Sequence, residues 1–292
     1  MPAPQGDDQR KAFLYFSVDV VDSVSYKARR LNEWPADFQA FLSDFPRGLQ
    51  ERCRAAALPN GCKRCLPPPQ RWKTAGDEIL MYVDIAEASG CNDHNTCERQ
   101  YELALYYAAV VTSAIRDHNS AAYRRLMTNE RAFLLKGAAW FANAVETSEY
   151  RDSCGNIVFP SPDSHEPGRR DFIGRQIDIG FRIAKYSTAN RFVLSVEYAV
   201  LLLRDNYITA QDAGLRLYSD GRRPIKGVLE HLGYPILYID MGDAFERAEE
   251  EVHNKRSEPA DPVSLMRYLQ EYIKRTDGLL GYPFISGDDL FG

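Results

Sequence analysis

A glycine–aspartate step joins two short runs of strand-forming residues early in the chain. The step, Gly76-Asp77, lies within WKTAGDEILMYV, residues 72–83. Two such runs around a two-residue turn predict a tight antiparallel hairpin. Most hairpin tips carry Asn-Gly or Asp-Gly, but here the order is reversed, Glu78 follows, and Lys73 stands three residues before the glycine. Such a hairpin needs a sheet to join, and its tip carboxylate needs a role.

A second strand is predicted nearer the N-terminus. Phe13–Val21, FLYFSVDVV, is apolar enough for a central strand buried on both faces. Asp19 lies inside it, where an ionised carboxylate is costly unless another group compensates for it. One interpretation pairs Asp19 with Lys73 or Lys27 and makes Asp77 an ordinary turn residue. The other brings both carboxylates together from adjacent strands as ligands of Mg²⁺ or Mn²⁺, and the order and spacing favour it.

The remaining segments predict an α+β protein. We expect helices over 36–57, 97–117 and 174–186, strands over 131–141 and 191–203, a hairpin over 225–240, a long exposed loop over 145–170, and one or two charged helices before an aromatic tail in the last fifty residues. No internal repeat is present. The expected architecture is an antiparallel or mixed sheet covered by helices.

Charge and hydropathy exclude several classes of protein. The 292 residues include 36 Lys and Arg against 41 Asp and Glu, a net charge of −5, so no polybasic field predicts binding to nucleic acid or a membrane surface. The first residues lack the pattern of a signal peptide. The most apolar stretch, Phe192–Leu203, is interrupted by Glu197 and is shorter than a membrane span. We expect a cytoplasmic protein.

The cysteines raise the question of a structural zinc site. Cys62 and Cys65 have zinc-knuckle spacing, but the six cysteines include no second pair with that spacing. In a cytoplasmic chain, reduced thiols in a loop-rich insertion are the favoured interpretation. Zinc binding at Cys62 and Cys65 stays open.

Three motifs in order resemble those of the class III nucleotidyl cyclases. FSVDVVDS is similar to that family's F-x-D-I-x-G-F-T, KTAGDEIL to its K-x-x-G-D, and DFIGRQIDIGFR to its D-x-W-G-x-x-V-N-x-x-x-R. Asp171, Gly174 and Arg182 fall in register with the third motif. The resemblance implies a ferredoxin-like cyclase domain over residues 1–240 with a C-terminal helical extension over 241–292.

The resemblance implies catalysis by two divalent metal ions, Mn²⁺ or Mg²⁺. Asp19 and Asp77 would hold them, with the Val20 carbonyl as a further ligand. The ions would activate the ribose 3′-hydroxyl for attack on the α-phosphate, with pyrophosphate as the leaving group. The alternative without a metal has Asp19 as an ion-paired buried residue and Asp77 as an ordinary turn residue.

Other residues match the family's substrate contacts. The resemblance implies phosphate binding by the backbone at Val21, Asp22 and Ser23 and by Lys226. It also implies stabilisation of charge on the α-phosphate by Arg182. The pair Asp22-Ser23 replaces the family's Gly-Phe, which predicts a differently shaped phosphate loop.

One position of the third motif departs from the family. Asp178 stands where the family has asparagine, and a carboxylate cannot act as the neutral amide donor. We expect it to orient Arg182 instead. The alternative for Arg182 is an exposed pair with Asp178 one helical turn away, which would contribute little.

Lys73 and Asp171 correspond to the pair that contacts the base in the family. A carboxylate acceptor beside a cationic donor suits adenine, uracil or cytosine and suits guanine less, so hydrogen bonding leaves ATP, UTP and CTP open. FSVDVVDSVSYK, FIGRQIDIGFRIAKYS and the C-terminal extension together resemble the Pycsar pyrimidine cyclases. These are antiphage-defence enzymes whose cyclic UMP or cyclic CMP activates a separate effector. The resemblance implies a uridylate cyclase first, with cytidylate or adenylate cyclase as alternatives.

The family geometry also implies a homodimer. The metal aspartates of one chain and the Arg182 helix of the other would form two composite sites between head-to-tail copies. A non-catalytic nucleotide-binding module is the alternative from another class, and it predicts loss of a metal aspartate or of the arginine, yet Asp19, Asp77 and Arg182 are all present. A metal-dependent phosphodiesterase or nuclease would use more histidine ligands than the five scattered ones here provide.

Overall fold

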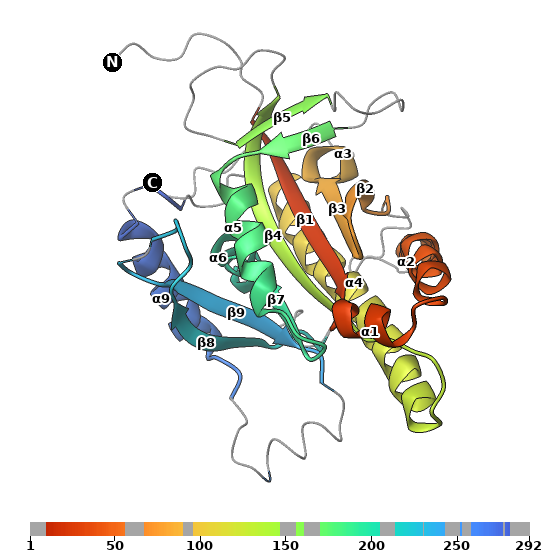
Figure 1. The fold of residues 1–292 in the computed structure, drawn as a ribbon. Helices are drawn as coiled ribbons and strands as arrows, with labels where there is room; N and C mark the ends of the chain where they lie inside the picture. Colours follow the sequence, from red (N-terminus) through yellow and green to blue (C-terminus); the bar gives the residue numbers. More distant parts are fainter. Residues whose placement is uncertain are drawn as a thin grey trace.

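The fold is built on one mixed β-sheet with helices on both faces (Figure 1). The computed structural model describes residues 10–55, 67–89, 96–146, 156–160, 170–204, 214–229, 231–242, 252, 258–276 and 278–280. The strands are β1 (Arg10–Val20), β2 (Gln70–Ala75), β3 (Glu78–Asp84), β4 (Leu135–Glu146), β5 (Asn156–Pro160), β6 (Arg170–Ile173), β7 (Arg191–Leu194), β8 (Leu217–Arg223) and β9 (Tyr234–Asp240). The helices are α1 (Ser23–Arg29), α2 (Trp34–Ala55), α3 (Ile85–Ser89), α4 (Thr96–Met127), α5 (Arg175–Ile183), α6 (Val196–Leu203) and α9 (Pro262–Lys274), with a 3₁₀ turn at Ala184–Tyr186.

The strand order places β1 at the centre of the sheet. It runs β2-β3-β1-β4-β7-β9-β8, with β5 beside β4 and β6 beside β5. β1 is antiparallel to both β3 and β4, whereas β4 is parallel to β7 and to β5. The strand predicted over Phe13–Val21 is therefore confirmed as a central one, and so is the hairpin of β2 and β3 beside it.

The two faces of the sheet carry separate apolar layers. Leu14 and Phe16 of β1 belong to the larger layer, which also includes buried residues of α2, α4, α6 and α9. Phe13 and Tyr15 point into a smaller, aromatic layer on the opposite face, under α5. Side chains alternate between the two faces along a strand, so β1, which has apolar side chains on both faces from Phe13 to Phe16, is buried on both sides.

Two predicted elements are wrong. The apolar run 191–203 is not one strand, because β7 ends at Leu194 and α6 follows it. The Ser195 side chain accepts a hydrogen bond from the Tyr198 N–H at 3.2 Å and caps that helix. The late hairpin does not span 225–240 either. β9 pairs with β8, and residues 225–228 form only an isolated bridge.

The helix predicted over 36–57 is confirmed as far as α2 reaches, to Ala55, and residues 56–57 lie outside the described part of the chain. The helix over 97–117 is confirmed within α4, that over 174–186 as α5 with the 3₁₀ turn after it, and the late charged helix as α9. The strand expected over 131–141 is β4, which begins at Leu135. The loop expected over 145–170 contains the strand β5, and its first and last residues belong to β4 and β6. The rest of this loop lies outside the described residues, as do Cys62, Cys65 and the aromatic tail. In the part of the chain that the structure describes, no helix has the length and apolar character to span a membrane.

Glu197 is a carboxyl group enclosed by this core. It lies on α6, is 1% exposed, and receives a long hydrogen bond of 3.5 Å from the Gln176 side chain of α5. Burial raises the pKa of Glu197 from 4.5 to about 7, although hydrogen bonds from its own backbone, Gln176 and Ser195 oppose the rise. The neutral acid is the form that the folded protein favours.

Glu197→Gln is expected to change how stability depends on pH. Between pH 4.5 and 7 the folded protein holds a proton on Glu197 that the unfolded chain has lost, so the wild type loses stability as pH rises through this range. Glutamine does not titrate, so the unfolding free energy of the Glu197→Gln protein relative to that of the wild type should grow by about 3 kcal/mol between pH 4 and pH 8. Urea unfolding at several pH values measures this. Glu51→Gln, on an exposed position of α2, is the control. A difference that stays constant with pH would contradict the assignment.

Candidate active site

The β2–β3 turn brings the two predicted metal ligands together. Gly76 has φ +69°, a left-handed conformation that glycine adopts without steric cost. The register pairs Asp19 with Glu78, so Asp77 lies next to the end of β1. The Asp19 and Asp77 carboxyl groups lie close enough for each to shift the pKa of the other. Adjacent strands therefore deliver two carboxylates to one point.

Each carboxylate also has a lysine partner. Lys136 Nζ of β4 lies 3.2 Å from Asp19 Oδ2, and Lys27 Nζ of α1 lies 2.9 Å from Asp77 Oδ1. Burial raises the pKa of Asp19, and Asp77 adds to the rise while Lys136 opposes it. Burial acts in the same direction on Asp77, but hydrogen bonds from Ser23 and Lys27 hold its pKa below the usual range. Asp77 is the more strongly ionised member of the pair.

These groups fit a divalent cation. Two neighbouring carboxylates repel each other unless a positive charge lies beside them, and Lys136 and Lys27 supply that charge here. Hard oxygen ligands are those that Mg²⁺ and Mn²⁺ prefer, and a bound cation would take over this compensation. No cluster of three or more His, Cys, Asp and Glu side chains that suits a metal occurs among the described residues. Further ligands would therefore be backbone oxygens, water or substrate. Glu78 accepts a hydrogen bond from Ser17 at 2.5 Å and is occupied there.

The loop after β1 differs from the expectation at Val21. Its N–H donates to the Leu134 carbonyl at 2.8 Å and continues the pairing of β1 with β4, so it is not available to a phosphate in this conformation. The Val20 N–H donates to Asp19 Oδ1 at 2.9 Å. Asp22 and Ser23 begin α1, where the first N–H groups have no acceptor within the helix. Their role in phosphate binding stays a prediction.

Asp22 adopts the backbone conformation that a glycine would favour. Its φ of 50° and ψ of 42° are left-handed, and aspartate is among the residues that tolerate this region. The Ser25 hydroxyl donates to Asp22 Oδ1 at 2.7 Å. Asp22 thus takes a backbone conformation that glycine adopts without steric cost, and the different loop shape expected from the change of residue type stays a prediction.

The predicted base-reading pair also meets in space. Lys73 Nζ of β2 lies 3.6 Å from Asp171 Oδ1 of β6, although the two residues are far apart in the sequence. The neighbouring Trp72 indole N–H donates to the same oxygen at 2.8 Å. Sequence reasoning did not identify Trp72, because an aromatic residue in a strand is ordinarily a core residue.

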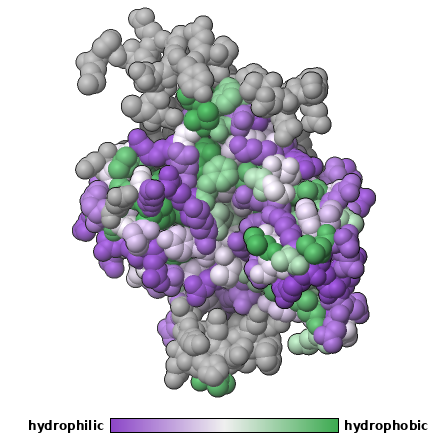
Figure 2. Space-filling model, viewed as in Figure 1, coloured by the Kyte–Doolittle hydropathy of each residue, from purple (hydrophilic) through white to green (hydrophobic). Residues whose placement is uncertain are grey.

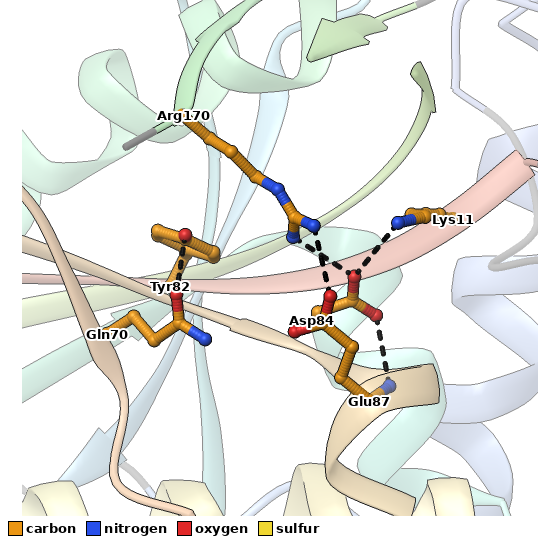
Figure 3. A network of polar contacts seen from close by, with 6 residues as sticks. All are labelled: Lys11, Gln70, Tyr82, Asp84, Glu87 and Arg170. Atoms are coloured by element: carbon orange, nitrogen blue, oxygen red, sulfur yellow. Dashed lines mark hydrogen bonds and ion pairs between the residues drawn. The ribbon is translucent and has the colours of Figure 1, made fainter. Parts of the chain in front are cut away.

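A polar network fastens β6 to the hairpin next to Asp171. Asp84 at the end of β3 is buried, and its carboxylate lies 3.3 Å from Arg170 Nη1 and 3.8 Å from Lys11 Nζ (Figure 3). Arg170 also pairs with Glu87 at 3.0 Å. Burial raises the pKa of Asp84, while the Glu87 N–H and the two cations oppose the rise. Because Arg170 directly precedes Asp171, these ion pairs help to hold the Asp171 carboxylate in place.

Arg182 and Lys226 form the third group of predicted site residues. The Arg182 guanidinium of α5 donates to the Lys226 carbonyl oxygen, so the contact is with the backbone of Lys226. In the described structure Arg182 makes no ion pair with Asp178, and the expected orienting contact is therefore not formed. No hydrogen bond or ion pair between described residues joins Arg182 to Asp19 or Asp77.

α5 is fixed by a side chain from β5 and by close packing. The Asn156 side chain accepts a hydrogen bond from the Gln176 N–H at 3.0 Å and donates to the Asn143 carbonyl at 2.8 Å. This supplies the cap that Gly174, the residue before the helix, cannot provide. Gly180 lies directly on Trp140, where a Cβ atom would come within 2.2 Å of the indole.

Large apolar side chains are exposed near both halves of the site. Val24 of α1 and Leu31 are 77% and 75% exposed, and Ile173 of β6 is 48% exposed. Figure 2 shows apolar surface in the middle of the face on which α5 and β1 lie, between hydrophilic margins. Exposed apolar groups of this kind can take part in protein–protein contacts.

Comparison with solved structures identifies the fold. The adenylyl cyclase CyaB from P. aeruginosa superposes with a TM-score of 0.51 at 14% identity, over 80% of this chain and 96% of that one. The guanylyl cyclase Cya2 gives a TM-score of 0.45 at 16% identity, over 80% and 92%. The guanylate cyclase domain of RhGC from Catenaria anguillulae gives 0.47 at 11%, over 79% and 96%.

The chain has the fold of class III nucleotidyl cyclase domains, which confirms the predicted fold class. No protein-family model and no curated protein sequence matches the chain. The likeness is therefore one of structure.

Gly180→Ala is expected to loosen α5 from the sheet. The new methyl group would overlap the Trp140 indole, and overpacking of this kind costs about 1–3 kcal/mol of unfolding free energy. Gly48→Ala in α2 is the matched control, because a Cβ there meets nothing within 4 Å and alanine favours the helix. Urea unfolding of both variants makes the comparison. A Gly180→Ala protein as stable as Gly48→Ala would contradict the close packing.

Proposed function

We propose that the chain is a nucleotide cyclase that converts UTP into 3′,5′-cyclic UMP and pyrophosphate. The observation that carries this proposal is the meeting of Asp19 with Asp77 and of Lys73 with Asp171 on a cyclase fold. Four residues from three separate segments form the two pairs that the cyclase motifs require. Cyclic CMP and cyclic AMP are the alternative products.

Asp19 and Asp77 would hold two divalent ions, Mn²⁺ or Mg²⁺, with the Val20 carbonyl as a further ligand. The ions supply a lowered pKa for the 3′-hydroxyl and neutralise phosphate charge. Asp22 and Ser23 contribute backbone N–H groups to the triphosphate, and Lys226 adds a charge.

Arg182 stabilises the negative charge that develops on the α-phosphate. In this structure it donates to the Lys226 carbonyl, and a bound phosphate would have to replace that acceptor. Asp178 lies one turn earlier on the same helix and is proposed to act beside the ribose or on Arg182 in the assembled site.

Asp171 and Lys73 together suit a base that has an N–H donor next to an acceptor. Asp171 supplies an acceptor and Lys73 a cation. Uracil meets this arrangement with N3–H and O4, cytosine with its amino group and N3, and adenine with its amino group and N1. UTP is placed first on the resemblance of FSVDVVDSVSYK and FIGRQIDIGFRIAKYS to the Pycsar cyclases. The same resemblance suggests a cytoplasmic antiphage role, with the product acting on a separate effector.

The active form is proposed to be a homodimer with two composite sites. Within the described part of one chain no bond connects Arg182 with Asp19 or Asp77, and a second copy arranged head to tail would bring the missing half. The exposed side chains of Val24 and Ile173 suit such an interface.

Incubation of the purified protein with each of the four nucleoside triphosphates and Mn²⁺ tests the proposed reaction. We expect 3′,5′-cyclic UMP and pyrophosphate, identified by mass spectrometry, with activity reduced by about 100-fold or more in Arg182→Ala. Cyclic CMP or cyclic AMP as the main product would show that CTP or ATP, and not UTP, is the substrate. Absence of any cyclic product with Mn²⁺ or Mg²⁺ would favour the non-catalytic binding module.

Mixing two inactive variants tests the composite site. An equimolar mixture of Asp77→Ala and Arg182→Ala chains should recover about one quarter of wild-type activity, because half of the dimers are mixed and each contains one intact site. Asp19→Ala mixed with Asp77→Ala is the control, since both changes lie in the same half and no intact site can form. Equal recovery in the two mixtures, or none in either, would rule out the shared site.

A further inference from the structure

Three groups converge on a single oxygen of the base-reading carboxylate. The Trp72 indole N–H donates to Asp171 Oδ1 at 2.8 Å, the backbone N–H of Phe172 donates to it at 2.9 Å, and Lys73 Nζ lies 3.6 Å from it. The other oxygen, Oδ2, receives none of these contacts. The protein therefore holds one oxygen of this carboxylate, and the other is left to accept a hydrogen bond from a ligand.

Trp72 is itself held rigidly. It is 1% exposed, and its ring lies 5.8 Å from that of Tyr15, 5.1 Å from Phe172 and 5.8 Å from Phe181. These neighbours come from β1, β6 and α5, so the indole cannot turn without disturbing three elements. A donor fixed in this way fixes its acceptor as well.

The same indole also positions the cation of the pair. Lys73 Nζ lies over the Trp72 ring at 4.1 Å from its centre, a cation–π arrangement. The edge of Trp72 thus contacts Asp171, and its face contacts Lys73. Trp72 therefore contacts and positions both Asp171 and Lys73.

We propose that Trp72 is a positioning residue that sets the base selectivity of the site through Asp171. It occupies Oδ1, the oxygen that Lys73 also faces, and so leaves Oδ2 as the acceptor for a base N–H. A carboxylate without this bond could rotate and offer either oxygen to bases of different shape, whereas a preorganised pair accepts one arrangement of donor and acceptor. This inference rests on the proposed function, because it assigns a role in reading the nucleotide.

Trp72→Phe removes the indole N–H and keeps an aromatic ring. Trp140→Phe is the matched control, because Trp140 belongs to the same aromatic layer, 5.6 Å from Phe181, and its buried indole nitrogen has no hydrogen-bond partner among the described residues. For Trp72→Phe we expect the ratio of kcat/KM between the preferred triphosphate and the next best to fall roughly tenfold, chiefly through KM. The ratio should stay within about twofold in Trp140→Phe. A selectivity ratio is independent of the fraction of protein that is folded.

A double variant separates positioning from general packing. In an Asp171→Asn background, Trp72→Phe should change selectivity no further, since the group through which it acts is already altered. Unchanged selectivity in Trp72→Phe, an equal loss in Trp140→Phe, or additive effects in the double variant would each overturn the inference.

The same comparison can be made without turnover. Dissociation constants of the four triphosphates, measured by calorimetry for the wild type and both single variants, should show the same loss of selectivity in Trp72→Phe alone. A wild type that binds selectively and forms no cyclic product would refute the proposed reaction and leave the role of Trp72 supported. A wild type that binds all four equally would refute the role of Trp72.

Discussion

The closeness of Asp19 and Asp77 is the constraint on which the rest of the site depends. The β1–β3 register places the two carboxylates side by side, and Lys136 and Lys27 supply the opposite charge that this arrangement needs. A shift of that register by one residue would turn every side chain of β1 to the other face. The apolar layers on both sides of the sheet therefore stabilise the geometry of a polar site at its edge.

The aromatic layer has a similar double function. Phe181 of α5 packs on Trp72 at 5.8 Å and on Trp140 at 5.6 Å, while Trp72 contacts the base-reading pair. The helix that carries Arg182 and the strand that carries Lys73 consequently share one packed surface. Interiors of this density transmit displacements between neighbouring elements, so the positions of Lys73 and of the proposed catalytic arginine are mechanically linked.

The parts of the fold that could be predicted are those with a local signal. The Gly76-Asp77 turn and the apolar β1 gave such signals. The run 191–203 did not, because an apolar segment without periodicity is compatible with strand and helix alike; only Ser195, as a helix cap, marked the change. Lys27 and Lys136 were also beyond prediction in their observed pairing. Their partners are set by the tertiary approach of α1 and β4 to the hairpin, which composition and spacing do not specify.

Asp22 illustrates why residue type and backbone shape have to be considered separately. A left-handed conformation costs a residue with a Cβ atom about 1 kcal/mol relative to its preferred one, and glycine avoids that cost. In Asp22 the bond from the Ser25 hydroxyl, 2.7 Å long, offsets part of it. The sequence departs from the cyclase motif here while the backbone keeps the turn that leads from β1 into α1. What the turn requires is a left-handed residue, and aspartate with a nearby hydroxyl donor meets that requirement as glycine does.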